Sequence, residues 1–150
     1  MQRLYVVLLI ALAFFPSVSF GCSCLATRGG VEGIKLAFLN ADVVVQAEVI
    51  ETSQRTIDSK TYGRAEQQIA KWKVNRSWKG ENQPGSNLET RTTVTCCLCG
   101  TSVKKGDIYL LYLSGQIPYE LWSCGSNKPF DKAKEEVEVI NSYLAEMRGT

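Results

Sequence analysis

The six cysteines are the residues of this sequence whose spacing most clearly indicates chemistry. Cys22 and Cys24 flank Ser23, three more fall in the run Cys96-Cys97-Leu98-Cys99, and the last is Cys124. Thiols placed in this way can form disulfides, hold a metal as thiolates or exchange electrons. The spacing lacks the paired Cys-x2-Cys units of structural zinc sites, and the N-terminal signal described below would export the chain to oxidising conditions. The pattern therefore favours disulfides, for which six cysteines allow fifteen connectivities.

The sequence contains no histidine, and this limits the catalytic chemistry open to it. Histidine is the commonest general base, the usual partner of serine and cysteine nucleophiles, and a frequent zinc ligand. The carboxylates do not replace it, because those in the strand region stand singly in polar contexts typical of a solvated surface. They are Glu48, Glu51, Asp58, Glu66 and Glu89. We therefore expect a protein that is not an enzyme and has no cofactor and no structural metal of its own.

The N-terminal residues have the pattern of a cleavable secretory signal. Residues 4–15 contain no charged side chain. As a helix this run covers about 18 Å, too short for a hydrocarbon core of about 30 Å. The small residues Ser19 and Gly21 suit the narrow pockets of a signal peptidase. We expect a signal peptide at residues 1–21, cleavage before Cys22, and no membrane span.

Export would deliver the mature chain to a secreted or periplasmic location. Removing the signal takes Arg3 with it and leaves 16 basic and 15 acidic residues, a net charge of +1 that predicts no partner. The length suits one domain over residues 22–150. Lipoprotein processing with acylation of Cys22 is an alternative. Against it, Ser19 stands where such signals usually carry an aliphatic residue, and five cysteines would remain.

Apolar periodicity predicts a mainly β chain with a helix near each end. Alternating apolar and β-branched residues indicate five strands, at residues 41–51, 69–78, 88–95, 108–113 and 119–123. The polar segment 53–63 is expected to be a hairpin tip, and Pro84-Gly85 lies in an expected turn at 80–87. A short helix is expected at 31–39. A C-terminal amphipathic helix is indicated by apolar residues at spacings of four and three, namely Ala133, Val137, Ile140, Leu144 and Met147.

Five strands with flanking helices are the elements of an OB-type barrel, a small sheet closed on itself. In the second strand the alternation should turn Ala70, Trp72 and Val74 inward and the lysines between them outward. A single core is expected to combine strand residues with one face of the C-terminal helix. Its predicted members are Val45, Trp72, Tyr109, Leu110, Val137, Ile140 and Leu144.

Several short motifs occur in order along the mature chain. They are Cys22-Ser23-Cys24, the segment FLNADVVV at residues 38–45, Trp78-Lys79-Gly80, Cys99-Gly100, Gly106 with Tyr109-Leu110, and Cys124. Together they resemble the N-terminal, netrin-like domain of the tissue inhibitors of metalloproteinases. The resemblance spans essentially the whole mature chain. It implies an OB-type barrel and, by analogy with the animal family, inhibition of zinc metalloendopeptidases.

The resemblance also implies roles for the residues at the mature N-terminus. It pairs Cys22 with Cys99 and Cys24 with Cys124, and it makes the first cysteine the group that inhibits. A catalytic zinc keeps an open coordination position, which the α-amino nitrogen and carbonyl oxygen of Cys22 would fill while Ser23 enters the specificity pocket. The rest of the implied reactive ridge consists of Cys24, Leu25, Ala26, Leu98 and Cys99. The implied partner is an extracellular or periplasmic zinc metalloprotease.

The sequence departs from the animal inhibitors at several positions. Leu39 stands where they carry a third cysteine, and Leu25-Ala26 replaces a stretch that contains proline. Cys96 and Cys97 have no assigned partner; a vicinal disulfide, a bond to another chain and exchange with Cys99 all remain open. The alternative function is a secreted, disulfide-stabilised binding module of the same fold without protease inhibition.

Basic and aromatic residues interleave in the second predicted strand, at Lys71-Trp72-Lys73 and Arg76-Ser77-Trp78-Lys79. This pattern is typical of single-strand nucleic-acid platforms. Alternation turns the Trp rings inward, however, and a net charge of +1 on an exported chain argues against nucleic acid as a partner. Asn75-Arg76-Ser77 is a glycosylation sequon, which has meaning only in a eukaryotic secretory pathway.

Overall fold

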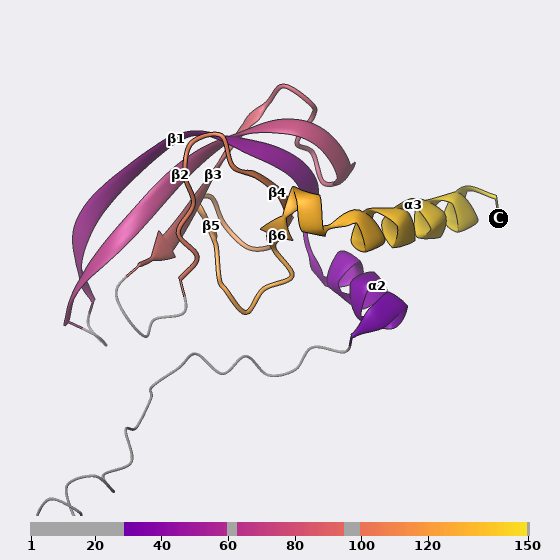
Figure 1. Cartoon of the computed structure of the whole chain (residues 1–150), viewed down its shortest axis with the longest axis horizontal. Coiled ribbons are helices and arrows are strands. Elements are labelled where there is room, and N and C mark those ends of the chain that lie inside the picture. Colours follow the sequence, from indigo (N-terminus) through magenta and orange to yellow (C-terminus); the bar gives the residue numbers. More distant parts are fainter. Residues whose placement is uncertain (1–28, 60–62, 95–99, 150) are drawn as a thin grey trace, which may run out of the picture.

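The structure is a computed structural model, and it describes residues 29–59, 63–94 and 100–149. These residues form a mainly β protein in which a curved sheet carries two helices at one end (Figure 1). The elements in chain order are α2 (Gly30–Asn40), β1 (Val43–Ser59), β2 (Gly63–Lys79), β3 (Asn87–Thr93), β4 (Ile108–Leu113), β5 (Tyr119–Glu120), β6 (Lys128–Pro129), the 3-10 turn η1 (Phe130–Lys132) and α3 (Lys134–Arg148). The prediction of a mainly β chain with a helix near each end is confirmed.

The six strands form one mixed sheet in the order β5-β3-β2-β1-β4-β6. All neighbours are antiparallel except β3 and β5, which run parallel. The structure thus has one strand more than the sequence predicts, because Lys128–Pro129 is too short to give a recognisable pattern. Among the described residues, the pairings do not join β5 to β6 and so do not close the sheet into the expected barrel.

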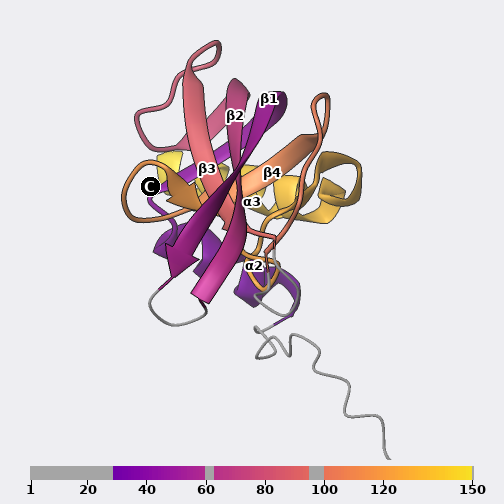
Figure 2. The same cartoon turned by 90° about the vertical axis from the view of Figure 1, so that its left-hand side faces the viewer.

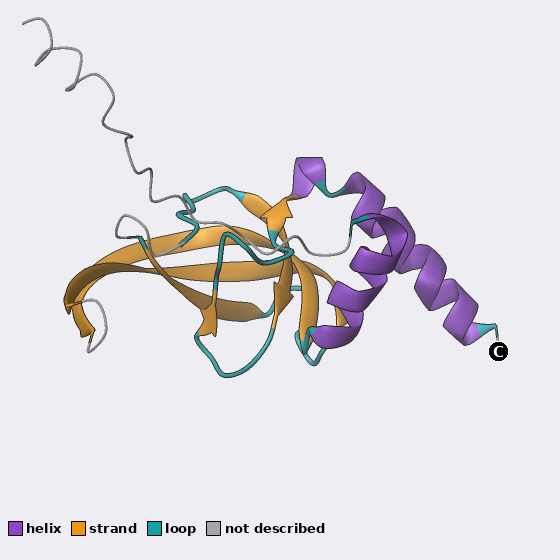
Figure 3. Ribbon diagram, turned by 90° about the horizontal axis from the view of Figure 1, so that it is seen from below, coloured by secondary structure: helices purple, strands orange, loops and turns teal. Residues whose placement is uncertain are grey.

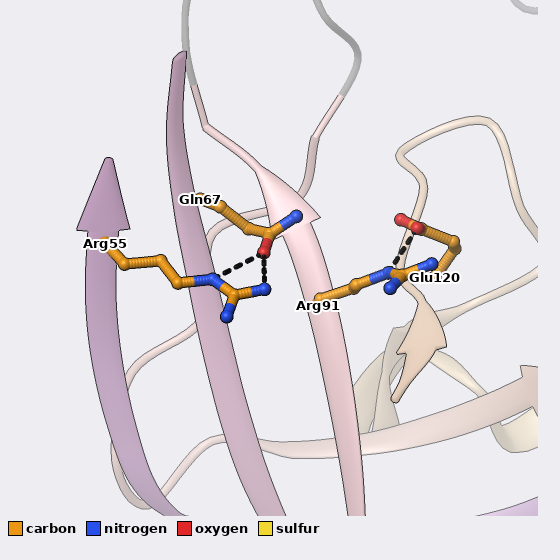
Figure 4. Close-up of polar contacts among 4 residues, drawn as sticks. All are labelled: Arg55, Gln67, Arg91 and Glu120. Carbon is orange, nitrogen blue, oxygen red and sulfur yellow. Dashed lines mark hydrogen bonds and ion pairs between the residues drawn. The ribbon is translucent and has the colours of Figure 1, made fainter. Parts of the chain in front are cut away.

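Strands β1 and β2 form a hairpin much longer than the sequence predicts. Each has 17 residues, and their pairing continues to Ser59 and Gly63. The expectation that residues 53–63 form a hairpin tip is therefore wrong. The segment is polar because both of its faces meet solvent, so it shows no alternation. Cross-strand contacts hold it instead: the Arg55 guanidinium donates from Nε and Nη2 to Gln67 Oε1 at 2.9 and 2.6 Å (Figure 4).

Irregular pairing near the start of β1 curves the sheet. Its register against β2 shifts at three places, between Val44 and Val45, between Gln46 and Ala47, and between Val49 and Glu51. Such irregularities increase local twist and bend a strand. Figure 2 shows the resulting strong twist of β1 across its neighbours.

The apolar residues form two cores, one on each face of the sheet. The larger cluster contains Val43, Val45, Ala47, Val49, Ala70, Trp72, Val74, Leu88, Val103, Leu111, Leu113, Tyr119 and Leu121. The second cluster, against the helices, contains Phe38, Ala41, Val44, Leu110, Ala133 and Ile140. The predicted single core is therefore wrong: Val45 and Trp72 belong to the first cluster, and Leu110 and Ile140 to the second. Consecutive β4 residues point to opposite faces, which separates Leu110 from Leu111.

The two helices lie side by side against one face at the end of the sheet (Figure 3). The predicted helix periodicity is confirmed at Ile140, which is fully buried, whereas Met147 at the end of α3 is half exposed. The rings of Phe38 in α2 and Tyr143 in α3 meet edge to face at 6.0 Å. Lys79 on β2 donates to the carbonyl oxygens of Phe38 and Leu39 at 3.0 and 2.9 Å, which satisfies acceptors at the end of α2.

Candidate functional site

The residues predicted to inhibit a protease lie outside the described part of the chain. These are Cys22, Ser23, Cys24, Leu25, Ala26, Leu98 and Cys99, together with the unassigned Cys96 and Cys97. The structure does describe Gly29 and Gly100, which follow residues 1–28 and 95–99, and Cys124, the proposed partner of Cys24. The contacts around these three positions are the observable frame of the candidate site.

Gly100, which follows Cys99, sits where no side chain fits. A Cβ at this position would lie 2.7 Å from Thr92 Oγ1 and closer still to the carbonyl oxygen of Thr93. The next residue, Thr101, donates its backbone N–H to Thr92 Oγ1 at 3.0 Å. Gly100 also forms a β-bridge with Trp122. The chain leaving Cys99 is thus pressed against the end of β3 on one side and paired with Trp122 on the other.

The loop after Gly100 is held by a buried amide side chain. Gln68 on β2 is 5% exposed, donates from Nε2 to the Val103 carbonyl oxygen at 3.0 Å, and accepts the Val103 backbone N–H at 2.9 Å. The Val103 side chain belongs to the larger core. At the far end of the loop, Gly106 donates its N–H to the carbonyl oxygen of Val49 at 2.8 Å. The loop is therefore a packed part of the fold.

The segment that leads to Cys124 is anchored to β3. The Leu121 N–H donates to the Arg91 carbonyl oxygen at 2.8 Å, and the Arg91 guanidinium pairs with Glu120 at 2.5 Å. Figure 4 shows this ion pair next to the Arg55–Gln67 contact. Trp122, which is 53% exposed, follows directly. Cys124 is disulfide-bonded, and since every other cysteine lies outside the described residues, its pairing with Cys24 stays a prediction.

A hollow of about 670 Å³ brings Gly29 and Cys124 to one place. Its other lining residues include members of α2, β4, β6 and α3, among them Tyr112 on β4, Lys128 on β6 and Glu136 on α3. We call it the Cys124 hollow. Gly29, the residue before α2, and Cys124 therefore line one hollow, although they are far apart in sequence.

Of two buried polar groups that line the Cys124 hollow, one has a partner and the other has none among the described residues. Glu136 is 8% exposed and forms an ion pair with Lys128. The Tyr112 hydroxyl is buried and has no hydrogen-bond partner among the described residues. Burial, and after it the negative charge of Glu136, raise the pKa of Tyr112 well above its usual value. The phenol is therefore neutral over the whole physiological range.

Sequence analysis missed most of this frame. From the sequence, Cys99-Gly100 was only a motif. The structure gives a physical reason for its glycine, because a side chain at position 100 would collide with β3. Gln68 gave no signal, because it lies just before the predicted strand 69–78 and glutamine is mostly a surface residue. The exposure of Trp122 was also not foreseen, because an aromatic residue within the predicted strand 119–123 usually indicates a core position.

Within the described ranges, the side chains form no cluster of three or more His, Cys, Asp or Glu residues that could hold a metal. No helix in these ranges is long and apolar enough to cross a membrane. The fold and frame define a mainly β protein with an anchored loop and a disulfide-bonded cysteine at one edge. Compared with models of known protein families and with curated proteins, the chain gives no match.

Proposed function

We propose that this protein is a secreted inhibitor of zinc metalloendopeptidases that acts through the α-amine and carbonyl of a mature N-terminal Cys22. In this proposal the sheet is part of an OB-type, netrin-like fold. Disulfides join Cys22 to Cys99 and Cys24 to Cys124. The proposal rests on the sequence motifs and on one structural observation, the meeting of three separate chain segments at one edge of the molecule.

The three segments supply the attachment points that the proposed reactive ridge, formed by the mature N-terminus and the Leu98-Cys99 segment, needs. Gly100 pairs with Trp122, two residues before Cys124, so the chain leaves Cys99 beside the segment that carries Cys124. Gly29 lines the same hollow as Cys124. Gly29 is only five positions after Cys24, and an extended chain of that length spans at most about 18 Å. Both proposed disulfides are therefore compatible with the positions of the described anchors.

The chemistry requires a neutral amine held in a fixed place. A catalytic zinc normally binds a water in its open position, and a bidentate amine and carbonyl would replace that water. The usual pKa of an α-amino group is about 7.7 to 8.0, so part of the population is neutral near pH 7, and metal binding increases that part. Two disulfides would fix the amine in advance and so reduce the entropy lost on binding.

The test changes only the amine. Protein with a native Cys22 N-terminus is compared with protein that carries one extra Ala before Cys22, against a panel of zinc endopeptidases. The extra residue moves the amine away from the metal, so inhibition should fall by orders of magnitude. Ser23→Gly is the graded control, because it leaves the proposed zinc contact in place and should change preference among proteases with pockets of different size.

Folding and disulfide content are checked for each form by thermal melting and by mass spectrometry of disulfide-linked peptides. The proposal fails if folded protein with a free Cys22 amine inhibits none of the panel at about micromolar concentration, which corresponds to about 8 kcal/mol of binding free energy. It also fails if the extended form inhibits equally well. A secreted binding module without protease inhibition would then be the better account of the fold.

A further inference from the structure

A second, smaller hollow lies where the end of β2 meets the last two turns of α3. Its volume is about 190 Å³, and its lining includes Arg76, Trp78, Asn141 and Arg148. We call it the Arg76 hollow. None of its lining residues is acidic. Neither Arg76 nor Arg148 forms an ion pair with a carboxylate among the described residues.

The Arg76 guanidinium is held in a defined orientation. Its central carbon lies 4.6 Å from the centre of the Trp78 ring, a stacking contact between residues on the same face of β2. One of its terminal nitrogens, Nη2, donates to Asn141 Oδ1 at 3.2 Å. Because a guanidinium has five N–H donors, most of them remain available for a ligand. Fixing the group in advance reduces the entropy that such a ligand would cost.

Asn141 adds further donors to the same hollow. Its Oδ1 accepts from both Trp78 Nε1 at 2.9 Å and Arg76 Nη2. Both partners can only donate, so their positions identify the amide oxygen without ambiguity. The Nδ2 group therefore keeps its two N–H donors. Arg148 brings a second guanidinium from the last turn of α3.

We infer that the Arg76 hollow binds a tetrahedral oxyanion group, a sulfate or a phosphate. Two guanidiniums without a carboxylate partner among the described residues and an amide offer several N–H donors, whereas the lining carries no carboxylate to repel an anion. Guanidinium groups match the geometry of such oxygens because two parallel N–H groups can bond two oxygens at once. The site is open to solvent, so binding should be weak and should fall as salt is added. This inference is independent of the proposed protease inhibition.

The test follows the Trp78 indole N–H and the Arg76 side-chain N–H signals by NMR while inorganic phosphate or sulfate is added to the folded protein. Both anions should shift these signals with a saturable dependence, and chloride at equal ionic strength should not. A methyl phosphate titration separates two sources of the ligand. If the ester binds as well as the inorganic ion, the hollow accepts a group carried on a larger molecule; if only the inorganic ion binds, the ligand is a free anion.

Variants locate the site. Arg76→Gln and Arg148→Gln should each weaken phosphate binding by about tenfold, the effect of losing one charge-assisted contact. Lys105→Gln removes one positive charge from an exposed turn outside the hollow and should leave the affinity unchanged. Arg76→Gln could loosen α3, because it removes the hydrogen bond to Asn141. Arg148 has no hydrogen bond to another side chain in the described part, so Arg148→Gln tests the site without that effect. Equal shifts with chloride, equal weakening by Lys105→Gln, or dependence on only one arginine would overturn the inference.

Discussion

Replacing Gly100 with alanine should destabilise the protein through a steric conflict at the edge of the candidate site. An added Cβ would lie 2.7 Å from Thr92 Oγ1 and nearer to the Thr93 carbonyl oxygen, which is backbone and cannot rotate away. The chain at Gly100 must therefore move. That movement costs the Thr101 hydrogen bond to Thr92 and the bridge to Trp122. Overpacking costs about 1 to 3 kcal/mol and each of the two lost contacts about 1 kcal/mol, which gives about 3 to 5 kcal/mol in total.

Urea denaturation followed by circular dichroism measures this loss, and Gly29→Ala is the matched control. Gly29 has a φ of −75° and nothing within 4 Å of its added Cβ, so alanine there should cost less than about 1 kcal/mol. If Gly100→Ala is no more destabilising than Gly29→Ala, the contact with β3 does not hold the loop and the reasoning is refuted. If the proposed function is right, Gly100→Ala should also weaken inhibition, because the displaced residue follows Cys99.

Three further predictions concern the core against the helices and the loop after Gly100. Tyr112→Phe should change stability by less than about 1 kcal/mol at neutral pH, because the lost hydroxyl has no described partner. Since the folded pKa of Tyr112 is raised, the wild type should lose stability above about pH 10 more steeply than Tyr112→Phe, as urea melts at about pH 8 and 11 would show. Ile140→Ala should cost about 2 to 5 kcal/mol by thermal or urea melting and the half-exposed Met147→Ala less than about 0.5, unless α3 is not docked. Gln68→Leu leaves both backbone groups of Val103 unpaired and should cost about 1 to 3 kcal/mol in the same urea assay; a smaller loss would mean that water replaces the amide.

The sequence predicted the fold where one face of an element is buried and the other is wet. The strand containing Trp72 shows this alternation, and the structure buries Ala70, Trp72 and Val74 while exposing Lys71 and Lys73. Periodicity could not reveal the outer half of the β1–β2 hairpin, because residues 51–58 of β1 are almost all exposed and carry no apolar alternation, and the buried Gln67 and Gln68 of β2 are polar. It also could not separate two cores. An apolar run such as that of β4 shows that both faces are covered, and it does not show by what.

The candidate site could be predicted only as a set of motifs. The cysteine spacing and the resemblance point to the mature N-terminus, which lies outside the described residues, so those roles remain proposals. What the structure adds is the steric and hydrogen-bonding reason for residues beside the motif, such as Gly100 and Gln68. These effects depend on a neighbouring strand whose position the local sequence does not encode. The local sequence does not encode the proposed oxyanion site either, because Asn141 on α3 contacts Arg76 on β2 only in the folded protein.

The pairing of β1 with β4 has a consequence for how the chain folds. The β1–β2 hairpin is local and can form early, whereas Val43 and its partner Leu113 are 70 residues apart in sequence. Contacts between α2 and α3 likewise join the two ends of the described chain. Because distant contacts lose loop entropy before they add stability, folding rate falls as their share rises. We therefore expect a slow-folding domain in which the docking of β4 and α3 limits the rate, and in which the frame of the candidate site is assembled late.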